Sequence, residues 1–179
     1  MALVVQTFPQ TAGANSYGDV AGFKAHHDLR LQSYTAYTDP QILAAVVAAT
    51  EYLDMRFAYN GWKTFAEQTT EFPRNDLYNA RGDLVQGVPT QVVKATYEYA
   101  IRWLRNGFTL VPDPEQDASG RSLKATQVDV GPISERKEYS EFGGYKLPEY
   151  PYPDNLLKAQ GFVASGKSGG IRSLPTARG

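Results

Sequence analysis

Residues 39–59 read DPQILAAVVAATEYLDMRFAY, and this stretch decides the fold class. Asp39 is a good N-cap, and Pro40 stands at the first helical position, where its missing N–H costs no hydrogen bond. Apolar residues then recur at steps of three and four residues, the spacing of one helix face. They are Ile42, Val46, Ala49, Leu53 and Phe57. Because Asn60 and Gly61 end the pattern, we predict a long helix to about residue 59, with a broad apolar face buried on two sides.

A second strong helix is predicted from Pro89 to about residue 105. Proline again takes the first position, and the apolar stripe has helical spacing. Its members are Val92, Val93, Thr96, Tyr97, Ala100, Ile101 and Leu104. Arg102 and Arg105 suit the negative end of the helix dipole, and Gly107 ends the helix.

A shorter helix is expected over residues 17–31. Ser16 and Asp19 have the spacing of a capping box, in which each side chain bonds a free N–H at the helix start. Gly18 and Gly22 lower the helix propensity of the same segment, so the prediction is weaker than for the other two helices.

The chain after residue 110 is poor in helical pattern. Residues 122–140 alternate partially and predict an extended arm or a β-hairpin with a turn near Gly131-Pro132. Residues 143–154 contain three prolines and predict an extended strap, and the tail after it is small and polar. The predicted fold is mainly α, a small three-to-four-helix bundle with an extended arm or β-hairpin and a long irregular C-terminal tail. The predicted divisions are an N-terminal arm (1–15), a helical core (16–110), the arm or hairpin (111–142) and the C-terminal strap and tail (143–179).

Composition excludes several classes of protein. The chain has 179 residues, 42% of them hydrophobic, which suits one domain, and its formal net charge of -1 does not suit a dedicated duplex-DNA binder. The absence of cysteine excludes disulfides and thiol nucleophiles. No signal peptide and no run of about 18 apolar residues is present, so we expect a soluble protein with no membrane partner. From residue 155 on there are four basic residues and no acid, which predicts a solvated end or a nucleic-acid contact: Lys158, Lys167, Arg172 and Arg178.

Residues 161–168, GFVASGKS, match the spacing of a P-loop. A P-loop needs a strand before it and a helix after it, because the loop amides and the helix N-terminus hold the phosphates. Here a proline-rich strap precedes the match, and Gly169-Gly170 and Pro175 follow it. We interpret the match as coincidental, with a P-loop nucleotide hydrolase as the alternative.

Other candidate catalytic or metal-binding residues also have simpler interpretations. The sequence His26-His27-Asp28 suggests metal ligands, but adjacent helical side chains diverge by about 100° and a third ligand would have to come from elsewhere. The carboxylate pairs Glu51/Asp54 and Glu67/Glu71 are typical of solvated helix faces. No nucleophile elbow is present. We therefore predict no catalytic residue, no metal and no cofactor, and a protein that is not an enzyme.

Aromatic and basic residues alternate around residue 60 and could stack single-stranded bases. They are Arg56, Phe57, Tyr59, Trp62 and Lys63. Packing in the core is the alternative interpretation.

Five short motifs, in this order, carry a family resemblance over residues 14–142. They are Asn15-Ser16-Tyr17; Ala58-Tyr59-Asn60-Gly61-Trp62; Gln68 followed by Phe72-Pro73-Arg74; Gly87-Val88-Pro89 leading into Val93-Lys94-Ala95-Thr96-Tyr97-Glu98-Tyr99-Ala100; and Val130-Gly131-Pro132-Ile133. Their order and spacing resemble the head-tail adaptor (head-completion or connector) proteins of tailed bacteriophages, among which one group is often labelled DnaT-like single-stranded-DNA-binding protein.

That resemblance implies a structural virion protein of the capsid-tail neck, assembled in the host cytoplasm. It implies a homo-oligomeric ring, a dodecamer, between the phage portal protein and a tail component such as a nozzle, stopper or tail tube protein, with packaged DNA passing through the lumen. Aromatic and apolar side chains of the last segment are the expected docking anchors. They are Tyr145, Tyr150, Tyr152, Leu156, Leu157 and Phe162. The alternative function is a single-stranded-DNA-binding replication accessory protein.

Overall fold

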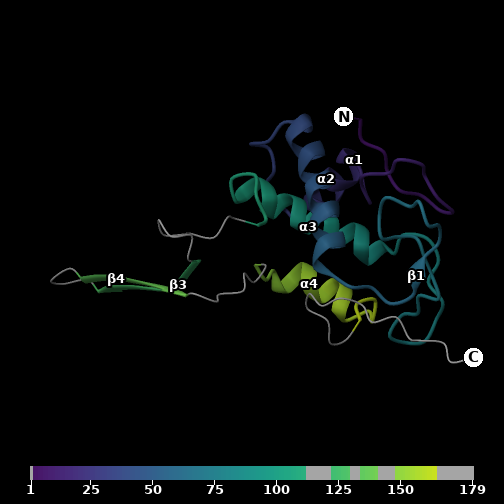
Figure 1. Cartoon of the computed structure of the whole chain (residues 1–179). Helices are drawn as coiled ribbons and strands as arrows, with labels where there is room; N and C mark the ends of the chain where they lie inside the picture. The colour runs from purple at the N-terminus through teal and green to yellow at the C-terminus, as the bar shows by residue number, and fades with distance from the viewer. Residues whose placement is uncertain (1, 112–121, 130–133, 141–147, 165–179) are drawn as a thin grey trace, which may run out of the picture. The chain divides into compact units, whose positions relative to one another are not determined.

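The computed structural model describes residues 2–111, 122–129, 134–140 and 148–164, and it divides into two compact units. The first unit, Met1–Leu110 with Glu149–Gly179, holds four helices (Figure 1). They are α1 (Val20–Asp28), α2 (Asp39–Arg56), α3 (Thr90–Arg105) and α4 (Pro151–Lys158). The predicted mainly α fold is therefore confirmed. None of the helices in the described ranges has the length and apolar character that crossing a bilayer requires.

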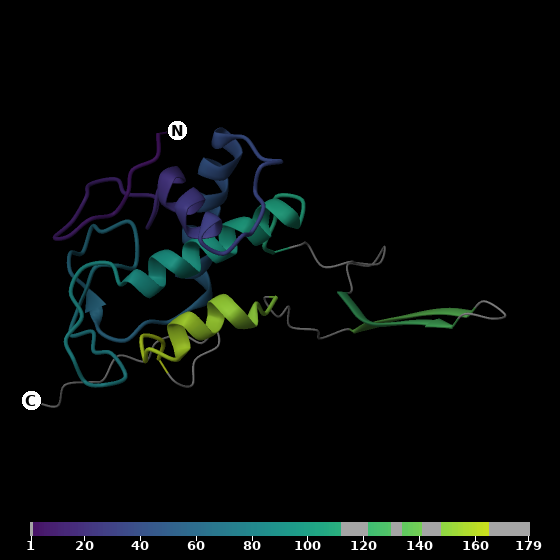
Figure 2. The same cartoon turned by 180° about the vertical axis from the view of Figure 1, so that it is seen from behind.

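The core of the first unit lies between α2 and α3. All members of the two predicted stripes except Phe57 and Val93 are buried, with Ile42 and Leu53 of α2 and Ile101 of α3 fully enclosed. Helix α1 packs on α2 and α3, while α4 runs along α3 in the opposite direction (Figure 1 and Figure 2). Burial of these stripes drives the association of the four helices, because apolar area removed from water stabilises by about 25 cal/mol per Å².

The start of α1 differs from the predicted one by three residues. Asp19 is the N-cap, and its carboxylate accepts a hydrogen bond of 2.6 Å from the backbone N–H of Gly22. A Cβ atom at Gly18 or Gly22 would overlap the Tyr97 ring. The two glycines that lower helix propensity thus let α1 approach α3 closely.

Residues 57–89, which we call the loop layer, connect the end of α2 to the start of α3. They contain one short antiparallel ribbon, β1 (Trp62–Lys63) with β2 (Arg74–Asn75), in which Trp62 pairs with Asn75 and Lys63 with Arg74. Phe72 and Leu77 are fully buried. The loop layer is therefore part of the packed core and not a free linker.

The C-terminal segment departs from the extended strap predicted up to residue 154. Helix α4 begins at Pro151, and Pro151 and Pro153 lie in its first turn, where a missing N–H is tolerated. After α4 the chain runs antiparallel to the segment that follows α2, since the N–H of Asn60 donates to Phe162 O (2.9 Å) and that of Ala164 to Ala58 O (2.8 Å). Residues 150–164 thus pack on their own chain, where the sequence suggested docking on others.

The second unit, Val111–Pro148, contains an antiparallel hairpin of β3 (Ser122–Asp129) and β4 (Ser134–Ser140). Its register runs from the Asp129–Ser134 pair to the Ser122–Ser140 pair, with one irregularity near Leu123. Of the two predicted alternatives, an arm or a hairpin, the structure has the hairpin. The turn predicted near residues 131–132 lies outside the described residues.

Candidate functional site

The six expected docking anchors lie in different environments. Leu157 and Phe162 are buried within their own chain, and Leu156 is partly buried. The Tyr150 hydroxyl donates to Leu110 O at 3.1 Å. Tyr152 is half-exposed, and Tyr145 lies outside the described residues. These positions do not test docking on a partner, but they make Leu157 and Phe162 part of the core.

The P-loop match has different surroundings from a nucleotide site. Helix α4 precedes it where a strand is required, and Val163 pairs with Tyr59 in an antiparallel bridge. Residues 165–168 lie outside the described ranges. The described half of the match therefore anchors the end of α4 to the loop layer.

The predicted stacking set does not assemble on one surface. Tyr59 is buried, and Arg56 donates to the Asp154 carboxylate at 2.7 Å. Lys63 pairs with Glu71 at 3.2 Å. Phe57 is partly buried, with its ring 5.4 Å from the Arg56 guanidinium carbon. Trp62, with 56% of its surface exposed, is the one member of the set that is mainly exposed to solvent.

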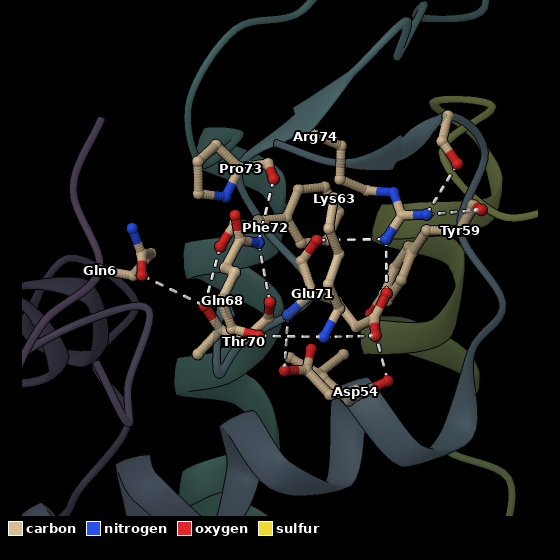
Figure 3. Close-up of polar contacts among 12 residues, drawn as sticks. Gln6, Asp54, Tyr59, Lys63, Gln68, Thr70, Glu71, Phe72, Pro73 and Arg74 are labelled. Carbon is tan, nitrogen blue, oxygen red and sulfur yellow. Dashed lines mark hydrogen bonds and ion pairs between the residues drawn. The ribbon is translucent and has the colours of Figure 1, made fainter. Parts of the chain in front are cut away.

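A buried polar network centred on Arg74 supports the loop layer (Figure 3). The Arg74 guanidinium donates to the carbonyl oxygens of Tyr59 (3.3 Å), Asn60 (2.8 Å) and Gly61 (2.8 Å). It also donates to the Glu71 carboxylate. One side chain therefore satisfies three carbonyl groups of the turn that follows α2, which would otherwise lose water without replacement.

The same network directs Trp62 outward. The side chain of Lys63 points into the network, where it meets the Glu71 carboxylate (Figure 3). Since successive side chains of a strand point to opposite faces, Trp62 points away from it. Trp62 is thus an exposed aromatic residue in a loop layer with more acidic than basic side chains. The acids are Glu67, Glu71, Asp76 and Asp83, against Lys63, Arg74 and Arg81.

Asp54 joins this network from α2. Its carboxylate accepts from the Tyr17 hydroxyl at 2.6 Å and from the Glu71 N–H at 3.1 Å. Burial raises the pKa of Asp54 to about 7, although these two hydrogen bonds lower it. Burial, followed by the nearby Asp54 charge, also raises the pKa of the Tyr17 hydroxyl well above its usual value. Both carboxylate oxygens of Asp54 accept hydrogen bonds from the chain itself, so we assign Asp54 a structural role.

Asp54→Asn is expected to remove a dependence of stability on pH between about pH 4 and about pH 7. Folding raises the pKa of this carboxyl, so the folded state binds a proton more tightly than the unfolded state. The contribution of Asp54 to the free energy of unfolding is therefore most favourable below about pH 4 and is lost as the pH rises to about 7. Each unit of difference between the folded and unfolded pKa corresponds to about 1.4 kcal/mol of this contribution. Urea unfolding across this range measures it. Glu67→Gln, at an exposed carboxyl of the loop layer, is the control, and parallel profiles for Asp54→Asn and the parent would contradict the prediction.

A second buried cluster brings together His26, His27 and Glu98. Their possible metal-binding atoms lie within 4.8 Å of one another, so the third ligand that the sequence did not identify comes from α3. His26 Nε2 lies 3.0 Å from Glu98 Oε1. Arg102 donates to Glu98 Oε2 at 2.8 Å, and Arg30 Nε lies 3.7 Å from Oε1.

This cluster fits an ion-pair network better than a metal site. Burial would raise the pKa of Glu98, but hydrogen bonds from His26 and Arg102 and their charges lower it to about 2. Two guanidinium groups beside the carboxylate repel a cation. The ring nitrogens of His27 already lie 3.0 Å from Gln32 Oε1 and 3.2 Å from Tyr97 O. These histidines therefore join α1 to α3.

The two arginines of this cluster mark a surface at the C-terminal end of α3. We call it the basic–aromatic end and define it as Arg30, Arg102, Trp103, Arg105 and Phe108. The rings of Trp103 and Phe108 meet edge to face, 5.1 Å between centroids, and Phe108 is 47% exposed. Arg30 and Arg102 flank one carboxylate and remain partly exposed. Proteins bind single-stranded nucleic acid by combining cations for the phosphates with aromatic side chains for stacking, and this end contains both residue types.

Arg105 is the least engaged cation of this end. Its guanidinium donates to Ser33 O at 3.2 Å, and among the described residues no carboxylate pairs with it. Glu98 is already paired with the two other arginines, and the exposed Asp28 accepts from the Tyr34 hydroxyl at 2.8 Å. The basic–aromatic end is thus better suited to phosphate than the loop layer around Trp62.

Sequence reasoning missed this surface. Arg102 and Arg105 have an ordinary explanation at a helix C-terminus, where they complement the dipole. Arg30 and Ser33 lie 72 residues earlier than Arg102 and Arg105, so no local pattern connects them. The sequence feature that could have indicated this surface is the run of residues 102–108, which contains two arginines, a tryptophan and a phenylalanine.

Comparison with known proteins corrects the expected identity. The family model described as "Putative DnaT-like ssDNA binding protein" matches residues 1–179, and no match points to a head-tail adaptor. No curated protein and no solved structure matches the chain. The head-tail adaptor assignment is therefore wrong, together with the virion terms and the portal, tail and ring partners that it implied. The description of the matched family instead supports the alternative function, single-stranded-DNA binding. Matched over its whole length, the chain belongs to the family of DnaT-like ssDNA binding proteins.

Proposed function

We propose that this protein binds single-stranded DNA through the basic–aromatic end, as a binding protein and not as an enzyme. Two observations support the proposal. The chain belongs to a family described as binding single-stranded DNA, and the basic–aromatic end combines three arginines of α3 and of the turn after α1 with the exposed ring of Phe108. The second observation determines the choice of site, because this end offers an aromatic ring for stacking a base and arginine side chains for contacting phosphate.

Phe108 is the proposed stacking platform for a base. It is held on the edge of Trp103, and its N–H donates to Trp103 O at 2.9 Å, so the ring has little freedom to lose on binding. Stacking on an aromatic side chain contributes about 1–3 kcal/mol per base, and unstacked bases of a single strand offer their faces without prior opening of a duplex.

Arg105, with Arg30 and Arg102, is the proposed phosphate contact. Because Glu98 already partly neutralises two of these arginines, we expect only about two phosphates to be neutralised. The logarithm of the binding constant should then fall with the logarithm of salt concentration with a slope of about -1 to -2. The formal net charge of -1 gives the protein no general attraction to duplex DNA.

The test uses the two tryptophans of the chain as separate reporters. Trp62→Phe leaves Trp103 at the basic–aromatic end, and Trp103→Phe leaves Trp62 in the loop layer. Titration with an oligo-dT strand should quench the fluorescence of Trp62→Phe and leave that of Trp103→Phe unchanged. Quenching in Trp103→Phe alone would place the strand at the loop layer and overturn the proposed site.

Binding constants from fluorescence anisotropy complete the test. Phe108→Ala should weaken binding roughly tenfold or more, and Arg105→Ala should weaken it and reduce the salt slope by about 0.7. Arg81→Ala, an exposed arginine of the loop layer, is the matched control and should bind like the parent. If the parent protein shows no salt-sensitive binding at micromolar concentration, the proposed function is wrong.

A further inference from the structure

Helix α1 ends in a turn that displays an apolar side chain from a strained backbone position. The N–H of Leu31 donates to Asp28 O at 3.1 Å and that of Gln32 to His27 O at 3.0 Å, the two hydrogen bonds of a Schellman motif. Leu31 takes the left-handed position of this motif, with φ 53°. Glycine usually occupies it, because a Cβ atom is disfavoured there.

Within the described ranges, no burial of the side chain compensates for leucine at this position. Leu31 is 96% exposed, and Leu29, two residues earlier, is 85% exposed. A strained and exposed apolar residue destabilises the protein on both counts, and such strain is found preferentially at functional sites. Among the described residues, the other non-glycine residues with positive φ are Asp76, a type that tolerates this conformation, and Phe108. The two apolar residues in this conformation, Leu31 and Phe108, thus belong to the turns that follow α1 and α3.

The α1 turn is continuous with the basic–aromatic end. Arg30, which belongs to that end, lies between the two leucines in sequence and reaches the Glu98 carboxylate of α3 at 3.7 Å. Two residues after Leu31, Ser33 O accepts from the Arg105 guanidinium at 3.2 Å. The leucines are thus flanked by the cations that, in the proposed function, contact phosphate.

We infer that Leu31 is a wedge that packs against the face of an unstacked base and favours single-stranded over duplex DNA at the basic–aromatic end. This inference rests on the proposed function. An apolar side chain can pack against the face of a base only if the base is already unstacked. In a duplex the bases must first be unstacked and the helix bent, which costs free energy. Arg30 and Arg105 on either side hold the phosphates, so the strand passes over the turn with its bases toward Leu31. The left-handed backbone keeps the side chain projected from the turn in the absence of any packing partner.

The decisive variant is Leu31→Gly, because it should raise stability and lower affinity together. Glycine relieves the left-handed strain, so the melting temperature should rise by roughly 2–4 °C. Affinity for an oligo-dT strand should fall roughly fivefold through loss of apolar contact, while the weaker affinity for a duplex of the same length stays unchanged. Leu31→Asn, which also tolerates this backbone conformation, should give the same loss of affinity. Asp76→Gly is the control, because it introduces glycine at a left-handed position of the loop layer and should leave DNA binding unchanged.

The outcomes separate this inference from the function on which it rests. If Leu31→Gly binds oligo-dT as tightly as the parent while Phe108→Ala does not, the wedge is wrong and the proposed function stands. Equal losses for single strand and duplex would overturn the role in strand preference. A lower melting temperature for Leu31→Gly would overturn the strain argument. If the parent protein binds no oligo-dT, both proposals fall.

Discussion

Replacement of Arg74 by alanine is expected to destabilise the fold by about 3–5 kcal/mol, the loss that follows removal of one partner from a buried ion pair. Arg74 is buried, and its guanidinium donates to three carbonyl groups of the turn after α2 and to both the carbonyl and the carboxylate of Glu71. Alanine removes this donor from all of them at once, and among the described residues only the Glu71 carboxylate keeps a second partner, Lys63 at 3.2 Å. Urea unfolding followed by circular dichroism measures the loss.

The matched control for Arg74 is Arg81→Ala in the same loop layer. Arg81 is exposed, so its removal should change the free energy of unfolding by less than about 0.5 kcal/mol. Arg74→Lys should recover only part of the loss, because an ammonium group cannot present the planar set of donors that the three carbonyl groups use. Equal stability of Arg74→Ala and Arg81→Ala would show that the turn after α2 does not depend on this network.

Asp154→Ala is the second change with a large expected effect, also about 3–5 kcal/mol. The Asp154 carboxylate is buried between α4 and the core, where it accepts from the Tyr99 hydroxyl and, at 2.7 Å, from the Arg56 guanidinium. Burial, and then the hydrogen bond to Asp154, raise the pKa of the Tyr99 hydroxyl. Without the carboxylate, Arg56 loses this partner at a site where only 9% of its side chain is exposed.

Asp154→Asn should be intermediate, because an amide oxygen still accepts from Tyr99 but carries no charge for Arg56. Asn155→Ala, at the exposed neighbouring position, is the control and should leave stability close to that of the parent. Amide hydrogen exchange of α4 should become fast in Asp154→Ala and stay slow in Asn155→Ala. Slow exchange in both variants would mean that apolar contacts such as those of Leu157 hold α4 without the ion pair.

Placement of α4 bears on the proposed function. The Tyr150 hydroxyl accepts from Asn106 and donates to Leu110 O, so the start of α4 supports the chain on both sides of Phe108. Loss of α4 docking is therefore expected to loosen the turn that presents Phe108, even though α4 contains none of the residues assigned to the basic–aromatic end.

The two long helices could be predicted from the sequence because their signals are local. The prolines at residues 40 and 89 and the three- and four-residue spacing of apolar side chains act within single turns, and α2 and α3 begin within one residue of the predicted positions. The first turn of α4 was missed because its prolines were interpreted as extended, although proline in a first turn is as compatible with a helix.

The sequence by itself therefore determined the fold class and the two central helices, since each depends on neighbours along the chain, while the choice of a hairpin over an extended arm came from the structure. Only the tertiary structure decided which side chains meet: Arg74 with the turn after α2, Glu98 with His26, and Arg105 with Ser33. The last two contacts join residues 72 positions apart and form only when α1 packs on α3. For the same reason the stacking residues predicted around residue 60 were separated by burial and pairing, while the basic–aromatic end was assembled from two helix ends that share no local pattern.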